Sequence, residues 1–128
     1  MNEVVLDASA IVAVLDREPG HEKLTLDILS RAIASAVNVA EVQMVLVNRG
    51  MAPEDAWRNA CSPLREIADF TAEQARIAGT LVNQTRSLGL SLGDRACLAL
   101  GIRMSAPVYT ADRAWKKLRP GIEVRLLR

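Results

Sequence analysis

Five short apolar runs recur along the chain, and longer segments with helical spacing separate them. The runs predict strands near Glu3–Leu6, Ala32–Ala36, Arg65–Phe70, Pro107–Thr110 and Glu123–Leu126. The intervening segments predict helices over Ala8–Asp16, Gly20–Arg31, Asn38–Arg49, Pro53–Cys61, Thr71–Leu88 and Ser91–Arg103, and a short turn from Arg113 to Leu118. Strands that alternate with helices indicate βαβ units, and therefore a largely parallel sheet covered on both faces.

The 128 residues contain no linker, repeat or low-complexity segment, so we expect one domain over residues 1–128. Half of the residues are hydrophobic but only 3% are aromatic, so the core must be aliphatic. No apolar stretch is long enough to cross a bilayer, and the N-terminus lacks the basic start of a secretory signal. Cys61 and Cys97 lack the spacing of a metal site and are predicted to be reduced core residues. These features together predict a cytoplasmic protein that does not enter membranes.

Four acidic residues stand at the edges of apolar segments or within them: Asp7, Glu41, Asp94 and Asp112. A buried carboxylate costs several kcal/mol, by rough estimate, unless hydrogen bonds or an opposite charge offset it. Asp7 and Asp112 follow predicted strands, and ligands of open α/β sheets bind beyond the carboxyl ends of the strands. If the four converge there, they form an all-oxygen site of the kind that Mg²⁺ or Mn²⁺ prefers.

Helix capping is the simpler explanation for each of these acids taken singly. Asp7 and Asp112 precede predicted helical segments, where a carboxylate accepts hydrogen bonds from free backbone amides. The sequences Asn38-x-x-Glu41 and Ser91-x-x-Asp94 resemble capping boxes. Capping does not exclude metal binding, because a carboxylate has two oxygens and can face outward from a helix start.

Two of the acids share a helical face with apolar residues, which favours a site over a surface role. The neighbours on these faces are Val37, Met44 and Val45 for Glu41, and Cys97 and Leu98 for Asp94. We therefore expect both side chains to point toward packed material rather than water. Two carboxylates on packed helical faces, those of Glu41 and Asp94, would need a common positive charge to offset theirs.

The net charge of +1 conceals a basic C-terminal segment. Residues 1–102 carry nine basic and 13 acidic side chains, whereas residues 103–128 carry seven basic and two acidic ones. The seven are Arg103, Arg113, Lys116, Lys117, Arg119, Arg125 and Arg128. Such a segment is compatible with a polyanionic partner and equally with a solvated surface.

Four segments of the chain resemble the motifs of PIN-domain ribonucleases, especially the small VapC-type toxins of bacterial type II toxin–antitoxin systems. They are Val5-Leu6-Asp7-Ala8-Ser9-Ala10, Asn38-Val39-Ala40-Glu41-Val42, Leu90-Ser91-Leu92-Gly93-Asp94-Arg95-Ala96 and Tyr109-Thr110-Ala111-Asp112-Arg113-Ala114-Trp115. The resemblance implies a PIN-like three-layer α/β/α sandwich with a central, mostly parallel five-stranded sheet. It also implies that the four acids bind Mg²⁺ or Mn²⁺ and are catalytic.

Around that quartet the resemblance implies supporting roles for further residues. Ser9 and Thr110 would hydrogen-bond to the metal-binding acids. The family often has Ser or Thr shortly before the position of Glu41, where this chain offers Ser35 or Asn38. Arg95 and Arg113 each follow a predicted metal ligand directly. This position, rather than the resemblance, leaves two roles equally open to them: contact with the substrate backbone, or pairing with neighbouring acids.

The function implied by the resemblance is that of a metal-dependent endoribonuclease toxin. It would hydrolyse RNA phosphodiester bonds and inhibit translation and growth until a cognate VapB-type antitoxin binds it. The family also implies a homodimer and a toxin–antitoxin hetero-oligomer, acting in the cytoplasm.

Two other functions remain open from the sequence. The first is a non-catalytic PIN-like module that binds RNA or protein, which the effect of metal removal on activity would distinguish. The second is a Mg²⁺-dependent phosphotransfer domain, which is disfavoured because no second acid lies two residues after Asp7. A histidine-based nuclease is disfavoured because His21 is the only histidine and lies in a polar helix start.

Overall fold

A five-stranded parallel sheet forms the centre of the molecule in the computed structural model, which describes residues 2–118 and 121–128. The strands are β1 (Val4–Leu6), β2 (Ala32–Ser35), β3 (Glu66–Ala68), β4 (Val108–Thr110) and β5 (Val124–Leu126). Their order is β3-β2-β1-β4-β5, and all four pairings are parallel. The predicted strands are confirmed, and the sheet is fully rather than mostly parallel.

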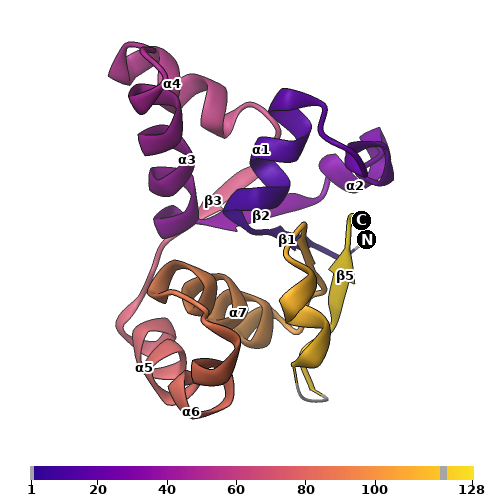
Figure 1. Ribbon diagram of the computed structural model, residues 1–128, viewed down its shortest axis with the longest axis vertical. Coiled ribbons are helices and arrows are strands. Elements are labelled where there is room, and N and C mark those ends of the chain that lie inside the picture. The colour runs from indigo at the N-terminus through magenta and orange to yellow at the C-terminus, as the bar shows by residue number, and fades with distance from the viewer. Residues whose placement is uncertain (1, 119–120) are drawn as a thin grey trace.

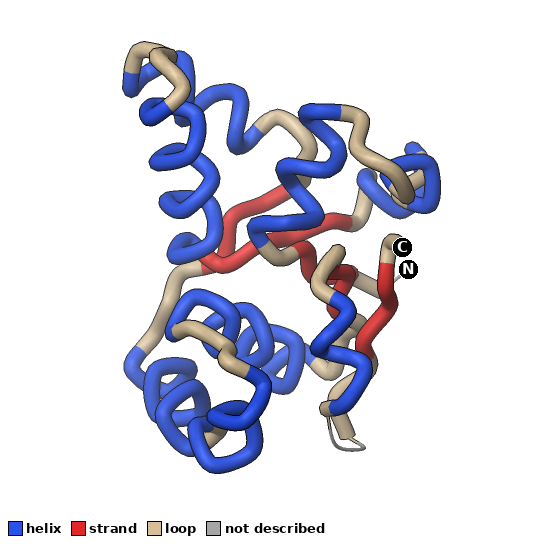
Figure 2. The backbone as a smooth tube through the Cα atoms, viewed as in Figure 1, coloured by secondary structure: helices blue, strands red, loops and turns tan. Residues whose placement is uncertain are grey.

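Helices cover both faces of this sheet (Figures 1 and 2). On one side lie α1 (Ala8–Asp16), η1 (His21–Lys23), α2 (Leu26–Leu29), α3 (Ala36–Asn48) and α4 (Pro53–Cys61). On the other lie α5 (Ala72–Thr80), α6 (Val82–Thr85), η2 (Arg86–Leu88) and α7 (Leu92–Met104). A short turn, η3 (Arg113–Lys117), precedes β5. The three-layer α/β/α arrangement is therefore confirmed.

The two faces of the sheet are packed by alternate residues of each strand. Val4 and Leu6 belong to the core beneath α1–α4, whereas Val5 belongs to the core beneath α5–α7. In β2, Ala32 and Ala34 likewise face the first core and Ile33 the second. Small and aliphatic side chains dominate both cores, as the scarcity of aromatic residues predicts.

The single helix predicted over Gly20–Arg31 is wrong. Two short pieces, η1 and α2, stand there instead, because the hydroxyl of Thr25 accepts a hydrogen bond from the Ile28 amide (3.3 Å) and starts a new helix. The break leaves Leu24 buried and Leu26 88% exposed. The predicted helix over Thr71–Leu88 is also divided into α5, α6 and η2. The hydroxyl of Thr85 donates to the Leu81 carbonyl (2.9 Å), a bond typical of bent helices.

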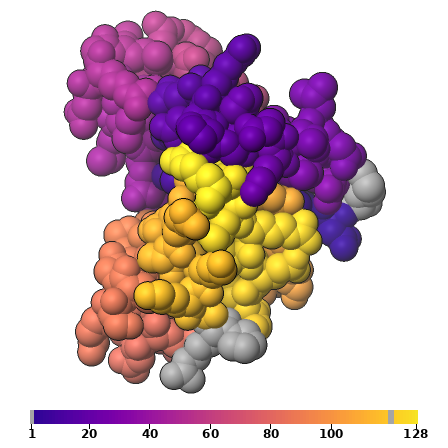
Figure 3. Space-filling view, turned by 45° about the vertical axis from the view of Figure 1, so that its right-hand side comes forward, coloured from indigo at the N-terminus to yellow at the C-terminus, as the bar shows by residue number. Residues whose placement is uncertain are grey.

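The topology brings distant parts of the chain to one edge of the sheet. The carboxyl ends of β1 and β2 lead directly into α1 and α3, and the end of β4 leads into η3. In Figure 3 the C-terminal residues, in orange and yellow, lie between the indigo N-terminal segment and the salmon-coloured helices α5 and α6. Among the described residues no helix combines the length and apolarity needed to span a membrane.

Candidate functional site

Asp7, the residue directly after β1, is a buried carboxylate surrounded by hydrogen-bond donors. Its side chain is 4% exposed. Oδ1 accepts hydrogen bonds from the Ser9 hydroxyl (2.7 Å) and from the Ala10 amide (2.7 Å), and Oδ2 accepts one from the Thr110 hydroxyl (2.6 Å). The bond from Ala10 is an N-cap of α1, so Asp7 caps a helix and faces the sheet edge at the same time.

The donors do not fully offset the burial of Asp7. Desolvation raises the pKa of Asp7 from 3.8 to about 6, and the charge of Asp94 adds to the rise, while the bonds from Thr110, Ser9 and Ala10 oppose it. A carboxylate left in this state is stabilised by a positive charge. The electrostatics at the end of β1 therefore favour a bound cation.

Ser9 and Thr110 join the ends of β1 and β4 around Asp7. Their hydroxyl oxygens are 3.3 Å apart. The Ser9 hydroxyl also accepts a hydrogen bond from the Ala111 amide (2.9 Å), and the Thr110 hydroxyl accepts one from the Asp112 amide (3.0 Å). Both residues that the resemblance assigned to support of the acids thus contact Asp7 directly.

Glu41 lies where α3 meets the first turn of α7. Its Oε1 accepts a hydrogen bond from the Asn38 side-chain amide (2.8 Å), which also donates to the Gly93 carbonyl (3.0 Å). A Cβ at position 93 would overlap the Glu41 carboxylate, 2.6 Å from Oε1, so any side chain there would displace this carboxylate. The Glu41 carboxylate therefore lies directly on the backbone of the residue that precedes Asp94.

Of the two predicted capping boxes, one exists. The Ser91 hydroxyl accepts from the Asp94 amide (3.2 Å), and Asp94 Oδ2 accepts from the Ser91 amide (2.9 Å). The box predicted for Asn38 and Glu41 is wrong, because α3 starts two residues earlier. Its cap is Ser35, whose hydroxyl accepts from the Val37 amide (3.2 Å).

The expectation that Glu41 shares a packed helical face is also wrong. Met44 is 61% exposed and Val45 is 38% exposed, so this face of α3 borders solvent. The buried face of α3 carries Asn38, Val39 and Val42 instead. Glu41 stands at the boundary of the two faces, where its carboxylate is accessible.

Three of the four acids lie within electrostatic reach of the buried Cys97 thiol. It is fully buried, and desolvation raises its pKa well above 9.0, with further rises from the charges of Asp7, Asp94 and Glu41. Cys97 lies one turn after Asp94 on α7. The acids from β1, α3 and α7 are therefore neighbours around the start of α7.

Asp112 lies apart from this group in its contacts. Its side chain is exposed, and Oδ1 accepts a hydrogen bond from the Ala114 amide (2.9 Å) as the cap of η3. Asp112 is connected to Asp7 only indirectly, through Thr110. The Thr110 hydroxyl accepts a hydrogen bond from the Asp112 amide and donates one to the Asp7 carboxylate.

The donor set fits a hard divalent cation, although the side chains are not arranged around one. Among residues 2–118 and 121–128, no three His, Cys, Asp or Glu side chains lie close enough to hold a metal ion as they stand. Each acid is instead turned to a local donor, as Asp94 is to the Ser91 amide. The chemistry still fits, since all donors are oxygens, the burial of Asp7 lacks a counter-charge, and Glu41 keeps one oxygen clear of Asn38.

The basic C-terminal segment does not form one patch. Arg103 pairs with Glu73 (2.5 Å), Arg125 with Glu123 (2.5 Å) and Arg128 with Glu18 (3.6 Å). Arg119 lies outside the described residues. Arg113, Lys116 and Lys117 stand together on η3, directly after Asp112, and are exposed.

The two arginines predicted to contact substrate differ. Arg113 is exposed beside Asp112. Arg95 is partly buried, and its Nη1 donates to the Leu90 carbonyl (3.0 Å), so it is turned back onto its own helix start. Substrate contact by either remains a prediction.

Sequence reasoning missed the part played by Gly93 and left Asn38 undecided. For Asn38 the signal was present in the chain, because a polar side chain buried in an apolar helix lowers stability unless a specific contact requires it. The meeting of Asn38 and Gly93 across α3 and α7 depends on tertiary packing, which spacing along the chain does not reveal.

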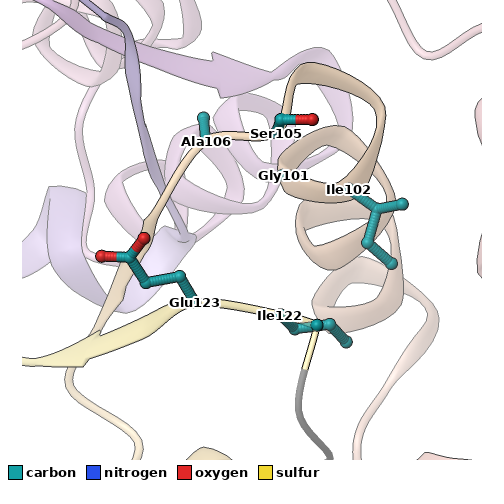
Figure 4. A pocket seen from close by; sticks show the side chains of 7 residues that line it. Gly101, Ile102, Ser105, Ala106, Ile122 and Glu123 are labelled. Carbon is teal, nitrogen blue, oxygen red and sulfur yellow. The ribbon is translucent and has the colours of Figure 1, made fainter.

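A hollow of about 220 Å³ lies at the opposite end of the sheet. Figure 4 shows Ser105 and Ala106, at the end of α7, facing Ile122 and Glu123. None of the four acids lines it. This hollow and the carboxylates therefore lie at different edges of the sheet.

Comparisons with known proteins agree with this geometry. A family model described as the PIN domain matches residues 4–119. A search of curated proteins found no match. PIN domains are generally nucleases, and PIN nucleases generally use divalent metal ions.

Several solved structures share the fold. DNA-bound VapBC from Salmonella typhimurium is 20% identical, with a TM-score of 0.76 over 100% of both chains. VapBC2 from Rickettsia felis, bound to a DNA fragment from the promoter, is 20% identical, with a TM-score of 0.72 over 95% of this chain and 96% of that one. VapBC-5 from Mycobacterium tuberculosis, a member of a family of toxin–antitoxin systems, is 23% identical, with a TM-score of 0.63 over 100% and 99%. The structural likeness shows the fold, and the family match shows the membership: this chain belongs to the PIN domain family.

Proposed function

We propose that this protein is a Mg²⁺- or Mn²⁺-dependent endoribonuclease. The observation that carries the proposal is the gathering of Asp7, Glu41 and Asp94 around the start of α7, with Asp7 buried and without a cationic partner among the described residues. Helix capping alone does not offset the burial of Asp7, whose desolvation still raises its pKa despite three hydrogen bonds. Membership of the PIN family supports the same conclusion.

Asp7, Glu41, Asp94 and Asp112 are the residues that would hold the cation. A divalent ion bound there supplies Lewis acidity and offsets the charge of a phosphodiester in the transition state. Asp7 is held in place by Ser9 and Thr110, so its oxygens are fixed before substrate arrives. Asp94 and Asp112, at helix starts, need only release one capping bond to turn toward the ion.

The exposed cations of η3 suit the binding of RNA. Arg113, Lys116 and Lys117 follow Asp112 directly, so a phosphate held by them lies beside the acids. Phosphate contacts give affinity without reading sequence, and they weaken with salt. The identity of the RNA and the cleavage site therefore depend on other contacts.

The toxin role rests on the shared fold. Three structures with this fold are of VapBC complexes, one of them described as a toxin–antitoxin system. We propose that the chain is likewise the toxin of a type II pair, a single PIN domain over residues 1–128 that acts in the cytoplasm as a homodimer. A VapB-type antitoxin would bind it and suppress cleavage.

Apolar residues near the acids are compatible with such a partner. The partly exposed Val12 and the exposed Val45 border a concave region that also includes Ser9 and Glu41. A segment lying there would cover the site.

The experiment that tests the enzyme proposal is RNA cleavage by purified protein with controlled metal. Cleavage is expected with Mn²⁺ or Mg²⁺, to cease with EDTA and to return when the metal is restored. Asp94→Asn should abolish it, whereas Asp27→Asn should not, because Asp27 lies in an exposed ion pair with Arg31. Cleavage that persists in EDTA would contradict metal dependence.

A second candidate is a non-catalytic PIN-like module that binds RNA or protein. The observation that favours it is that the acids, as arranged, hold no three-residue metal cluster among the described residues. Binding of RNA by the protein with no cleavage in any divalent metal would support it.

A further inference from the structure

We propose that Asn38 is a positioning residue that fixes the Glu41 carboxylate for metal binding, with Gly93 providing the space. The inference rests on the proposed metal-dependent function and concerns residues outside the acidic quartet. It is drawn from the contacts that join α3 to the first turn of α7.

The Asn38 side chain is placed where a polar group is expensive. It is 1% exposed and lies between Val37 and Val39 on a largely apolar helix. Its amide nitrogen donates both of its protons, one to Glu41 Oε1 (2.8 Å) and one to the Gly93 carbonyl (3.0 Å). One side chain therefore ties the candidate ligand on α3 to the backbone of α7.

The orientation of this amide follows from its neighbours. A carboxylate oxygen and a backbone carbonyl only accept hydrogen bonds, so the nitrogen must face both. As a result Asn38 Oδ1 is buried without a hydrogen-bond partner among the described residues. A purely structural residue at this place gains nothing from that unpaired oxygen, which costs about 1–3 kcal/mol.

Gly93 completes the arrangement from the other side. A Cβ there would overlap the Glu41 carboxylate, so only glycine lets the acid lie on the start of α7. Asn38 and Gly93 therefore act on the same carboxylate, which lies on the first turn of α7 next to the backbone of Asp94.

Glu41 needs this help because its own helix does not restrain it. Its side chain is only partly buried, and Met44 and Val45 on the same face are exposed. A long, half-exposed Glu without a partner samples several rotamers. The bond from Asn38 selects the rotamer that keeps the acid near Asp7 and Asp94.

Ser35, the other polar residue before Glu41, does not act in this way. Its hydroxyl accepts from the Val37 amide and caps α3 (3.2 Å). Of the two residues that the family resemblance left open, Asn38 is the one that contacts Glu41.

The test uses Mn²⁺ binding by the full chain, measured by calorimetry, together with thermal unfolding. Asn38→Leu removes the donor and also the unpaired oxygen, so the fold is expected to survive. Its Mn²⁺ affinity should fall by about 10- to 100-fold, the usual effect of losing a residue that orients a metal ligand. An unchanged Mn²⁺ affinity in a folded Asn38→Leu would overturn the inference and leave the metal site intact.

Gly93→Ala provides a second variant that leaves Asn38 untouched. It should displace Glu41 and weaken Mn²⁺ binding, although alanine favours the helix. Gly79→Ala is the matched control, because Gly79 lies inside α5 with no atom within 4 Å of an added Cβ. Gly79→Ala should keep wild-type affinity, and equal affinities in the two variants would contradict the role of Gly93.

A double-mutant cycle shows whether Asn38 acts through Glu41. In a Glu41→Gln background, Asn38→Leu should cause little further loss of Mn²⁺ affinity. Additive losses would show that Asn38 acts independently of Glu41 and would refute the inference. If the wild-type protein bound no Mn²⁺ even at millimolar concentration, the proposed function would fail and the inference with it.

A metal-free readout separates these cases. The side-chain amide protons of Asn38, followed by NMR, should exchange slowly in the wild type and faster in Glu41→Ala. Fast exchange in the wild type would show that the bond to Glu41 does not persist and would overturn the inference without any reference to metal.

Discussion

The two edges of the parallel sheet differ in whether their polar side chains are buried or exposed. At the carboxyl edge, Asp7, Thr110 and Asn38 are buried and hydrogen-bonded to one another or to neighbouring residues. At the amino edge, around the hollow between α7 and β5, Glu123 is exposed and pairs with Arg125 on the surface. The first edge carries a free-energy cost in its buried polar groups, whereas the second carries almost none.

A well-formed hollow does not by itself mark the site in this protein, because the concave region beside Ser9 and Glu41 is the larger of the two, about 380 Å³ against about 220 Å³. The hollow in Figure 4 has a defined volume, but its lining holds one exposed carboxylate and mostly backbone and aliphatic groups. The carboxyl edge has the perturbed group, since the pKa of Asp7 is raised to about 6. Perturbed titratable groups are concentrated at functional sites.

The largest expected effect is the loss of cleavage when a carboxylate is changed to an amide at the carboxyl edge. Asp7→Asn should reduce RNA cleavage by more than the roughly 10- to 100-fold that follows loss of an orienting residue. Glu123→Gln is the matched change at the amino edge and should leave cleavage unchanged. Rates from purified proteins check both, and equal rates in the two variants would remove the functional distinction between the edges.

The next effect concerns stability and pH. Because burial raises the pKa of Asp7 from its ordinary value of 3.8 to about 6 in the folded protein, the folded state holds this proton more tightly. The contribution of Asp7 to stability is therefore greatest below pH 3.8 and is lost as the pH rises through about 6. The difference corresponds to about 3 kcal/mol.

Urea unfolding of metal-free protein measures this effect. Asp7→Asn does not titrate, so its free energy of unfolding should gain about 2 kcal/mol relative to wild type between pH 4 and pH 7. Stability curves of the two proteins that run parallel over this range would show that Asp7 is not perturbed.

Thr110 gives a smaller effect, because it acts by holding Asp7. Thr110→Val keeps the shape but removes the donor to Asp7 Oδ2 and the acceptor for the Asp112 amide. Cleavage should fall by about 10- to 100-fold. Thr110→Ser retains the hydroxyl and should recover most of the activity. A Thr110→Val protein with wild-type kcat would exclude this role.

The smallest effect concerns the cations of η3. Replacing Arg113, Lys116 and Lys117 by Gln should reduce the salt dependence of RNA binding, lowering the slope of log affinity against log salt by about 2. The paired residues Arg103, Arg125 and Arg128 serve as the control triple variant, with a smaller change in slope. A larger change in the control would place the RNA on the β5 side.

The sequence predicted most of the fold because the pattern of apolar positions is local. All five strands and the capped starts of α5 and α7 follow from short stretches such as Thr71 and Ser91 with their neighbours. The break at Thr25 was missed because the helical spacing of Leu24 and Ile28 predicts a continuous helix. The Thr25 hydroxyl instead caps a new helix at this position.

The site was predicted less completely, for a physical reason. Asp7 and Thr110 stand at strand ends, so the parallel topology alone brings them together. The face of Glu41 was misjudged because helical spacing does not show which of two apolar stripes on α3 is covered. The contact of Asn38 with Gly93 joins residues 55 positions apart, and no pattern along the chain encodes it.

The most direct test of the central claim is a titration of the metal-free protein with Mn²⁺, followed by thermal unfolding, for wild type and Asp7→Asn side by side. Mn²⁺ is expected to raise the unfolding temperature of the wild type in a saturable manner and to have no effect on Asp7→Asn. The same Mn²⁺-dependent rise in both proteins would contradict the claim that the carboxyl edge of the sheet is a metal site built on Asp7.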